Sequence, residues 1–184
     1  TNMRMPVLFL AHGSPMNAIE SNRFTDDWQA LAKNIPTPKA IVVFSAHWFI
    51  GQTLVQSQAK QNTQHDFFGF PEALNKCQYN PPGAPKLAQN LSNTLNKAGF
   101  YAEAQNAFGL DHGSWSVLTH LYPKAYIPTL QISLNASQKD LSWHFNLAKT
   151  LQEYRQQGVL FIGSGNIVHN IPKWMQSRPS DPID

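Results

Sequence analysis

Ala40-Ile-Val-Val-Phe-Ser-Ala46 is a continuous apolar run in which β-branched and aromatic residues predominate. Such a run is typical of a strand buried on both faces, as in the middle of a parallel sheet. Other segments of the chain show strand patterns of varying clarity. They occupy residues 6–11, 53–58, 100–107, 127–134 and 158–163. The segments with an uninterrupted apolar pattern predict buried strands. The irregular pattern of 53–58 favours an edge strand, and Pro128 in 127–134 favours an edge strand or a position early in the strand.

Helical patterns separate these strands. Residues 23–34 are expected to form a helix, with Asn22 as its N-cap. A second helix should open at the proline-rich stretch 81–85, because leucines follow at the i, i+4 spacing of one buried face. These leucines are Leu87, Leu91 and Leu95.

A third helix is expected late in the chain. Ser137 and Asp140 resemble a capping pair, and Gly158 suits the position just after a helix end. Strands that alternate with helices in this way predict an α/β fold. We expect a single-domain αβα sandwich around a mostly parallel or mixed central sheet.

Composition narrows the possible classes of protein. With 184 residues, residues 1–184 are expected to form one domain. The net charge is +3 without any run of Lys or Arg, so a nucleic-acid partner is not expected. No apolar stretch approaches 18 residues and no signal-peptide pattern opens the chain, so a membrane partner is not expected either. A lone cysteine, Cys77, fits a reducing cytoplasm.

Three of the seven histidines share one setting. His12 and His47 directly follow predicted strands, and His169 lies a few residues past the last one. Ligands of open α/β sheets bind beyond the carboxyl ends of the strands, so the three imidazoles could converge there on one metal ion. Imidazole suits both zinc and Fe(II). Taken alone, a histidine after a strand is usually a loop residue or a hydrogen-bonded one, and it is the repeated setting that favours a metal site.

Other residues leave two interpretations open. His112, in a predicted loop with Asp111, is either an acid–base or substrate-orienting group or part of a turn. His65 belongs to an aromatic-rich loop, where it lines a pocket or is simply exposed. Aromatic residues in the predicted loops either supply the apolar walls of a pocket or simply pack. They are Trp48, Phe67, Phe68, Phe70 and Trp115.

Motifs of other enzyme classes are missing from the sequence. There is no nucleophile elbow, phosphate-binding loop, dinucleotide fingerprint or zincin motif. His120 and His144 fall in predicted helices and are expected to be packing or surface residues. Cys77 has no base beside it in the sequence and is expected to play no part in chemistry.

Several stretches taken together resemble the class III extradiol ring-cleaving dioxygenases, in the branch of the 4,5-DOPA extradiol dioxygenases. They run in order over nearly the whole chain: Leu10-Ala-His-Gly-Ser-Pro-Met-Asn17, Ser45-Ala-His-Trp48, His65-Asp-Phe-Phe-Gly-Phe-Pro71, Tyr79-Asn-Pro-Pro-Gly-Ala-Pro85, Asp111-His-Gly-Ser-Trp115 and Gly163-Ser-Gly-Asn-Ile-Val-His-Asn170.

The resemblance implies an α/β domain with a non-haem metal at the carboxyl edge of the sheet. It implies that His12 and His47 bind the metal and that His169 is either a third ligand or a base beside it. His112 would orient the substrate or move protons. Members of the family also continue past this C-terminus and supply a further His or Glu ligand. We expect the chain to lack that segment. Either the chain is incomplete, or solvent completes the metal site, or the protein is inactive as it stands.

The function expected from this reasoning is oxidative opening of a catechol such as DOPA by O₂. Fe(II) would be the active metal, with Zn(II) expected in crystals. His112 or His169 would act on protons, while His65, Trp48 and Trp115 would contact the substrate. The alternatives are a zinc-binding protein of the same fold without oxygenase activity, or a zinc-dependent hydrolase. The oligomeric state is not predicted.

Overall fold

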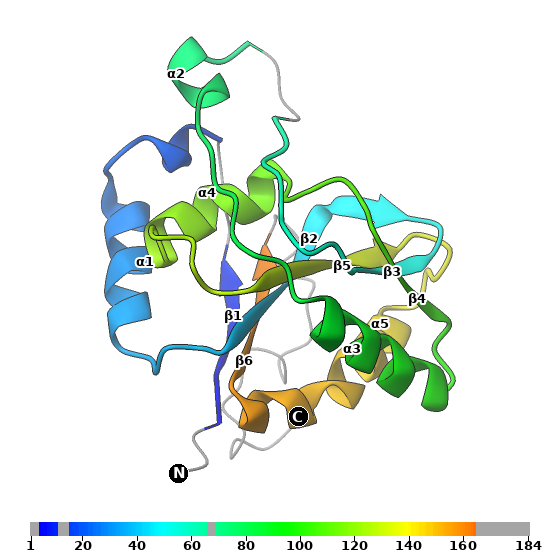
Figure 1. Ribbon diagram of the computed structural model, residues 1–184. Coiled ribbons are helices and arrows are strands. Elements are labelled where there is room, and N and C mark those ends of the chain that lie inside the picture. Colours follow the sequence, from blue (N-terminus) through cyan, green and yellow to red (C-terminus); the bar gives the residue numbers. More distant parts are fainter. Residues whose placement is uncertain (1–3, 11–14, 66–68, 165–184) are drawn as a thin grey trace.

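A six-stranded sheet forms the centre of the structure (Figure 1). The computed structural model describes residues 4–10, 15–65 and 69–164. The strands are β1 (Val7–Leu10), β2 (Ala40–Ile50), β3 (Thr53–Gln56), β4 (Ala102–Gln105), β5 (Thr129–Asn135) and β6 (Val159–Ser164), in the order β1-β6-β2-β5-β3-β4. Neighbours are parallel except for β5 and β3. The mixed sheet of the predicted α/β fold is therefore confirmed.

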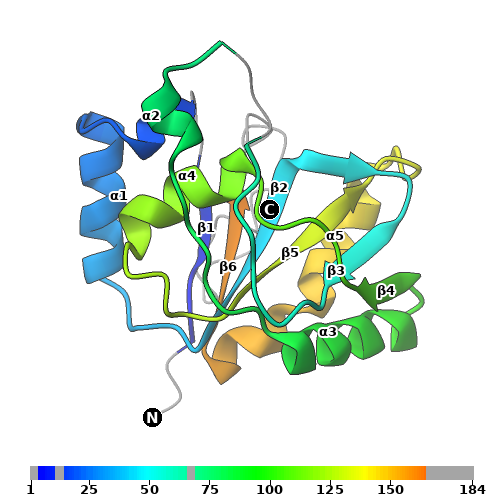
Figure 2. The same ribbon diagram turned by 45° about the horizontal axis from the view of Figure 1, so that its top comes forward.

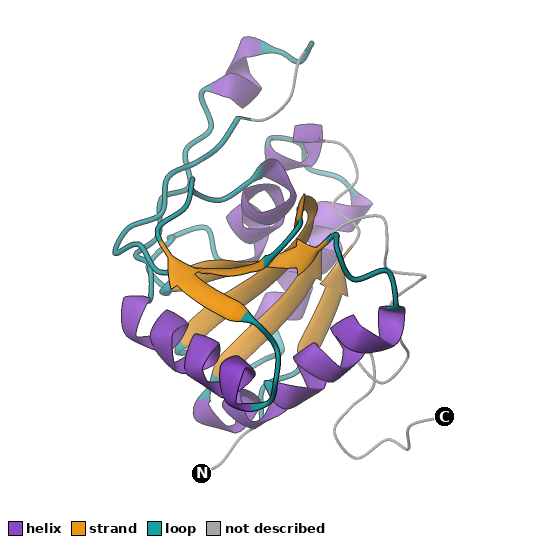
Figure 3. Cartoon of the chain, turned by 90° about the vertical axis from the view of Figure 1, so that its right-hand side faces the viewer, coloured by secondary structure: helices purple, strands orange, loops and turns teal. Residues whose placement is uncertain are grey.

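Helices cover both faces of this sheet (Figures 2 and 3). One layer holds α1 (Arg23–Lys33) and α4 (His112–Leu121), while the other holds α3 (Pro85–Lys97), α5 (Leu141–Thr150) and the 3₁₀ helix η2 (Gln152–Gln157). Two short helices, η1 (Pro15–Ala18) and α2 (Glu72–Asn75), complete the set. In the part of the chain that is described, no helix is both long enough and apolar enough to cross a bilayer.

The alternation of side chains along the central strands divides the core in two. In β2, Ile41 and Val43 point to the α1 and α4 layer, whereas Val42 points to the α3 and α5 layer. All three are fully buried. Because successive side chains of a strand face opposite ways, an uninterrupted apolar run fills both cores at once. This is why the apolar pattern of residues 40–46 predicts a central strand.

The helix ends agree with the sequence in two of three places. Asn22 caps α1, since its side-chain oxygen accepts from the Thr25 amide at 3.1 Å. Gly158 follows η2 with a φ of 87°, a left-handed conformation that glycine adopts freely. The expected helix start at Ser137 is wrong, because Ser137 hydrogen-bonds the side chain of Asn135. Asp140 caps α5 instead.

One strand prediction needs correction, and for another the structure decides between the two alternatives. Residues 53–58 were expected to form an edge strand, but β3 lies between β5 and β4 and all four of its residues are buried. Its pattern is irregular because the buried Thr53 and Gln56 are satisfied by hydrogen bonds rather than by solvent. β5 is internal as well. Pro128 precedes it and accepts a hydrogen bond from Ile41, so the early position is the correct one.

Candidate functional site

β2 departs from its neighbour β5 at the residues where the predicted site begins. Phe44 pairs with Ile132, and the next pair joins Phe49 to Leu134, so five residues of β2 advance against two of β5. His47 lies in this irregular segment with its side chain exposed. An irregularity of this kind re-aims side chains. The sequence placed His47 after the strand, whereas it lies inside a longer one.

The N-terminus of α4 brings the second histidine to the same place. Asp111 caps the helix, its Oδ1 accepting from the Ser114 amide at 3.1 Å. His112 is the first helical residue and is buried. The predicted loop at 111–115 is therefore wrong from residue 112 onward. An aspartate cap stabilises a helix start enough to offset the poor helix propensity of Gly113.

His47 and His112 lie side by side. Their ring centroids are 4.1 Å apart, with the planes inclined at 46°. Gly113 permits this approach, because a β-carbon at residue 113 would lie 2.9 Å from His47 Cδ2 and 3.0 Å from Ser45 Oγ. The Ser164 hydroxyl donates to the Gly113 carbonyl and so joins the end of β6 to α4. Three separate elements thus meet at one point.

Asp111 connects these elements. Its Oδ1 accepts from the Ser45 hydroxyl at 2.9 Å, and its Oδ2 accepts from Gln131 Nε2 at 3.1 Å. The Asp111 amide donates in return to Gln131 Oε1 at 3.1 Å. The carboxyl is only 3% exposed, and the positive end of α4 stabilises a negative charge there. Asp111 therefore fixes β2, β5 and α4 relative to one another.

A buried hydrogen-bond network of glutamine side chains stabilises this arrangement of β2, β5 and α4. The Gln131 amide donates to Gln56 Oε1 at 3.0 Å, and Gln61 Nε2 donates to the same oxygen at 2.9 Å. Gln56 in turn donates to the carbonyl of Phe108, just before the α4 cap. All three glutamine side chains are fully buried. A buried network in which the amides are paired rigidifies the site.

Asp111→Ala is expected to lower the free energy of unfolding by about 3 kcal/mol or more, because it leaves buried donors on Ser45, Ser114 and Gln131 without their acceptor. Urea unfolding measures the loss. Asp140→Ala is the matched control, since Asp140 also caps a helix but is exposed. A much smaller loss is expected there. Equal losses in the two variants would contradict the role assigned to Asp111.

The remaining predicted ligands follow β6, which is a neighbour of β2, and β1, which is the next strand beyond β6. Leu10 of β1, Ser164 of β6 and Ser45 of β2 are in register across three parallel neighbours. In the sequence, His12 comes two residues after Leu10, and His169 comes five after Ser164. Both histidines lie outside the described residues. Within the described ranges no group of three or more His, Cys, Asp or Glu side chains could hold a metal ion.

The predicted substrate-contacting residues lie in or near the core. Trp115 is fully buried, and its indole donates to the Gln64 carbonyl at 2.7 Å. The half-buried His65 ring lies 5.7 Å from that of Trp115 and donates to the Cys77 carbonyl. Trp48 is 2% exposed and packs edge-on against Phe108. Their contact with a substrate stays a prediction; Asp66, Phe67 and Phe68 lie outside the described residues.

The other histidines and the cysteine lie elsewhere. His120 accepts a hydrogen bond from Gln29 on the surface of α1 and α4. His144 donates to the Asn135 carbonyl from α5. Both are packing or surface residues, as expected. Burial raises the pKa of the Cys77 thiol, which disfavours the reactive thiolate.

Comparison with known proteins gives consistent matches. Residues 6–181 match a family model described as the catalytic LigB subunit of aromatic ring-opening dioxygenase. A 4,5-DOPA dioxygenase extradiol from Escherichia coli (strain K12) is 46% identical over 176 residues, which are 95% of this chain and 64% of that protein. A protein of the same name from Mirabilis jalapa is 38% identical over 165 residues, covering 88% and 61%.

A solved structure shows the same fold. It is that of an uncharacterized protein from Escherichia coli K12, with a TM-score of 0.73 and 42% sequence identity. The match covers 91% of this chain and 62% of the solved one. The chain therefore spans somewhat less than two thirds of the length of these relatives.

Proposed function

The chain belongs to the family of catalytic LigB subunits of aromatic ring-opening dioxygenases, and on that premise we propose that it opens a catechol ring beside its two hydroxyls with O₂. Membership implies a non-haem metal and a small-molecule substrate. The observation that carries the proposal is the imidazole pair of His47 and His112, at 4.1 Å, on the edge of the sheet where such ligands bind.

The chemistry of the histidines near this edge supports a metal. The His47 side chain is exposed. It lies in the part of β2 where the pairing with β5 is interrupted, between Phe44 and Phe49. We propose that His47 holds the metal with His12 and His169, which follow β1 and β6, the next two strands of the sheet on one side of β2. Imidazole ligands suit Fe(II), our proposal for the active metal, and also Zn(II). When bound, Fe(II) would lower the pKa of the catechol hydroxyls and supply the redox chemistry for O₂.

His112 is proposed to handle protons. Its ring lies beside that of His47 and is held by the capped first turn of α4, so it can take a proton from a catechol hydroxyl on a ring nitrogen and return it later. His169 is the other candidate for this role. Asp111 and Gly113 act indirectly, since they set how closely α4 approaches β2.

The substrate is proposed to be a catechol such as DOPA, because several relatives carry the name 4,5-DOPA dioxygenase extradiol. An aromatic ring needs apolar walls with a few polar groups. His65, Trp48 and Trp115 are the residues that we propose for these walls. The lone cysteine supports a cytoplasmic location as part of the same proposal.

Oxygen consumption tests the proposal. The 184-residue chain is loaded anaerobically with Fe(II), mixed with DOPA or protocatechuate and exposed to air. A yellow ring-opened product is expected, formed with uptake of one O₂ per catechol. The zinc-loaded chain serves as the control and is expected to be inactive, because zinc does not change its oxidation state.

Other outcomes favour the alternatives. Saturable zinc binding without any turnover would support a binding protein of the same fold. Substrate hydrolysis that persists without O₂ would support a zinc-dependent hydrolase. Either result, together with no product from the iron-loaded chain, would remove the dioxygenase proposal.

A further inference from the structure

The Gln131 side chain makes a two-point contact with Asp111. Gln131 belongs to β5 and is fully buried on the α4 side of the sheet, opposite its neighbours in the strand. Its Nε2 donates to Asp111 Oδ2 at 3.1 Å, and its Oε1 accepts from the Asp111 backbone amide at 3.1 Å. A backbone N–H can only donate, and an ionised carboxylate can only accept. The side-chain amide of Gln131 therefore fits Asp111 in one orientation only.

The other carboxylate oxygen of Asp111 binds the two elements that carry the imidazoles. Its Oδ1 accepts from the Ser45 hydroxyl at 2.9 Å and from the Ser114 backbone amide at 3.1 Å. The Ser45 oxygen accepts in turn from the His47 backbone amide at 3.3 Å. Ser114 lies in the first turn of α4, two residues after His112. One buried carboxylate thus links the backbone segments of both histidines.

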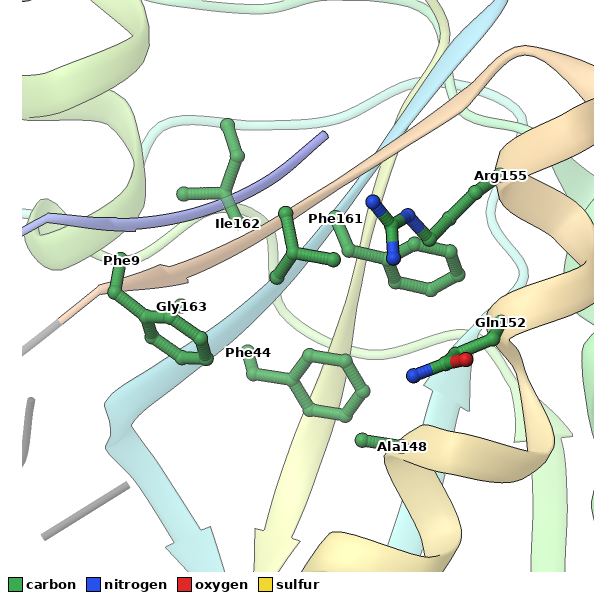
Figure 4. A pocket seen from close by; sticks show the side chains of 9 residues that line it. Phe9, Phe44, Ala148, Gln152, Arg155, Phe161, Ile162 and Gly163 are labelled. Carbon is green, nitrogen blue, oxygen red and sulfur yellow. The ribbon is translucent and has the colours of Figure 1, made fainter. Parts of the chain in front are cut away.

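The opposite face of these strands belongs to a separate core. Phe44 of β2 has its ring 6.5 Å from that of Phe161, on the α5 side of the sheet (Figure 4). Leu130 and Ile132, the neighbours of Gln131 in β5, pack in the same core. A substitution of Gln131 that keeps the size of its side chain therefore leaves this core in place.

The contact between residues 111 and 131 depends on which atoms donate and which accept. In Gln131→Glu, two carboxylates would face each other in a buried position, which is unfavourable because like charges repel strongly there. In Asp111→Asn, the new side-chain NH₂ would face either Gln131 Nε2 or the Ser114 amide, and both of these are donors. The double variant Asp111→Asn, Gln131→Glu restores an N–H···O bond at every one of these places, with the carboxylate moved to residue 131.

We propose that Gln131 is a positioning residue for the imidazole pair. By fixing the Asp111 carboxylate, it holds the start of α4 against β2, and so it sets the approach of His112 to His47, whose ring centroids are 4.1 Å apart. Gln131 acts through Asp111 and takes no part in the reaction itself. The inference rests on the proposed function for its effect on turnover, but not for its effect on the two rings.

Nuclear magnetic resonance of the metal-free chain tests the effect on the rings. Nuclear Overhauser effects between ring protons of His47 and His112 are expected in the wild type, with the signals assigned from His47→Ala and His112→Ala. They should disappear in Gln131→Glu and return in the double variant. The spectra are recorded well below the unfolding midpoint of every variant, so a loss of stability alone does not remove them.

Turnover by the iron-loaded chain measures the consequence for the reaction. Because a displacement of about 1 Å at a reacting group costs roughly 100-fold in rate, kcat of Gln131→Glu should fall by about that factor. KM for the catechol should change much less, since Gln131 is buried behind Asp111. The double variant should regain at least about tenfold of the loss in kcat, a coupling expected of residues in one hydrogen-bond network.

Asn96→Asp is the matched control. The Asn96 side chain makes the same kind of two-point contact near the end of α3, where Nδ2 donates to the Ala102 carbonyl and Oδ1 accepts from the Ala102 amide, both at 2.9 Å. This variant also turns an amide into a carboxylate and loses one donor. The ring contact and kcat should nevertheless stay at the wild-type level. If Gln131→Glu does not fold, Asp111→Asn takes its place, because it creates the same mismatch from the other side.

The two measurements separate this inference from the proposed function. A ring contact that is absent from the wild type, unchanged in Gln131→Glu or not restored in the double variant would overturn the positioning role. So would a lost ring contact with kcat unchanged, since the geometry would then have no bearing on the reaction. If the wild type turned over no catechol, the proposed function would fail, and the ring contact would still decide whether Gln131 positions the two imidazoles.

Discussion

If His47 is a metal ligand as proposed, alanine in its place is expected to abolish ring opening and to weaken metal binding by more than about 100-fold. Loss of an outer partner of a ligand already costs about 10–100-fold, and loss of a ligand costs more. The side chain is exposed, so its removal leaves the two cores of the sheet unchanged. The far-ultraviolet circular dichroism spectrum and the unfolding midpoint should match those of the wild type. Metal content after dialysis and oxygen uptake with DOPA measure the two losses.

His120→Ala is the matched control for this experiment. It removes an imidazole from α4 that hydrogen-bonds Gln29 instead of approaching His47. Metal content and turnover should stay at the wild-type level. A His47→Ala chain that retained both would show that the metal binds elsewhere, and the proposed function would then lose its structural basis.

Gly113→Ala should have the second-largest effect, and it should separate activity from stability. The new β-carbon would lie 2.9 Å from His47 Cδ2, so the imidazole must move. A displacement of about 1 Å at a reacting group costs roughly 100-fold in rate. Meanwhile alanine is a better helix former than glycine by about 1 kcal/mol, which offsets part of the steric cost in α4. We expect a folded chain with about 1% of the wild-type turnover.

Gly51→Ala controls for a glycine substitution as such. Gly51 lies between β2 and β3, and a β-carbon there would meet no atom within 4 Å. Its turnover should equal that of the wild type. Should the Gly113→Ala chain turn over catechol at the wild-type rate, the close approach of α4 to β2 would have no part in the chemistry.

The fold could be predicted from the sequence because the strongest signals are local. The run at 40–46 favours a central strand, since a strand covered on both faces can bury consecutive apolar residues. Pro85 and the leucines of α3 marked a helix in the same way. The order of the strands, by contrast, depends on pairings between distant segments. β3 therefore looked like an edge although it is enclosed by β4 and β5.

The candidate site could be predicted only in part from the sequence. His47 and His112 were each singled out, but nothing in the 64 residues between them indicates that their rings lie side by side. The approach depends on Gly113 and on the bond from Ser45 to Asp111, which join elements distant in sequence. Asp111 did offer a signal that was missed, because an aspartate before an apolar segment is a common helix start.

The buried glutamines were not predictable at all. Glutamine is a common surface residue, and Gln56, Gln61 and Gln131 follow no recognisable spacing. Their function appears only when three backbone segments converge and leave carbonyl and amide groups that need partners. Such networks follow from the assembled fold, so local sequence patterns carry no trace of them.

The stretch of β2 from Phe44 to Phe49, where the ladder with β5 is interrupted, places an unusual constraint on how relatives of this chain can diverge. Side chains alternate with every residue, so an insertion or deletion of one residue there would turn the imidazole toward the opposite layer. Substitutions in this stretch can accumulate gradually in evolution. Insertions and deletions cannot accumulate there in the same way. We expect the spacing between Ser45 and His47 to be the same in every active relative.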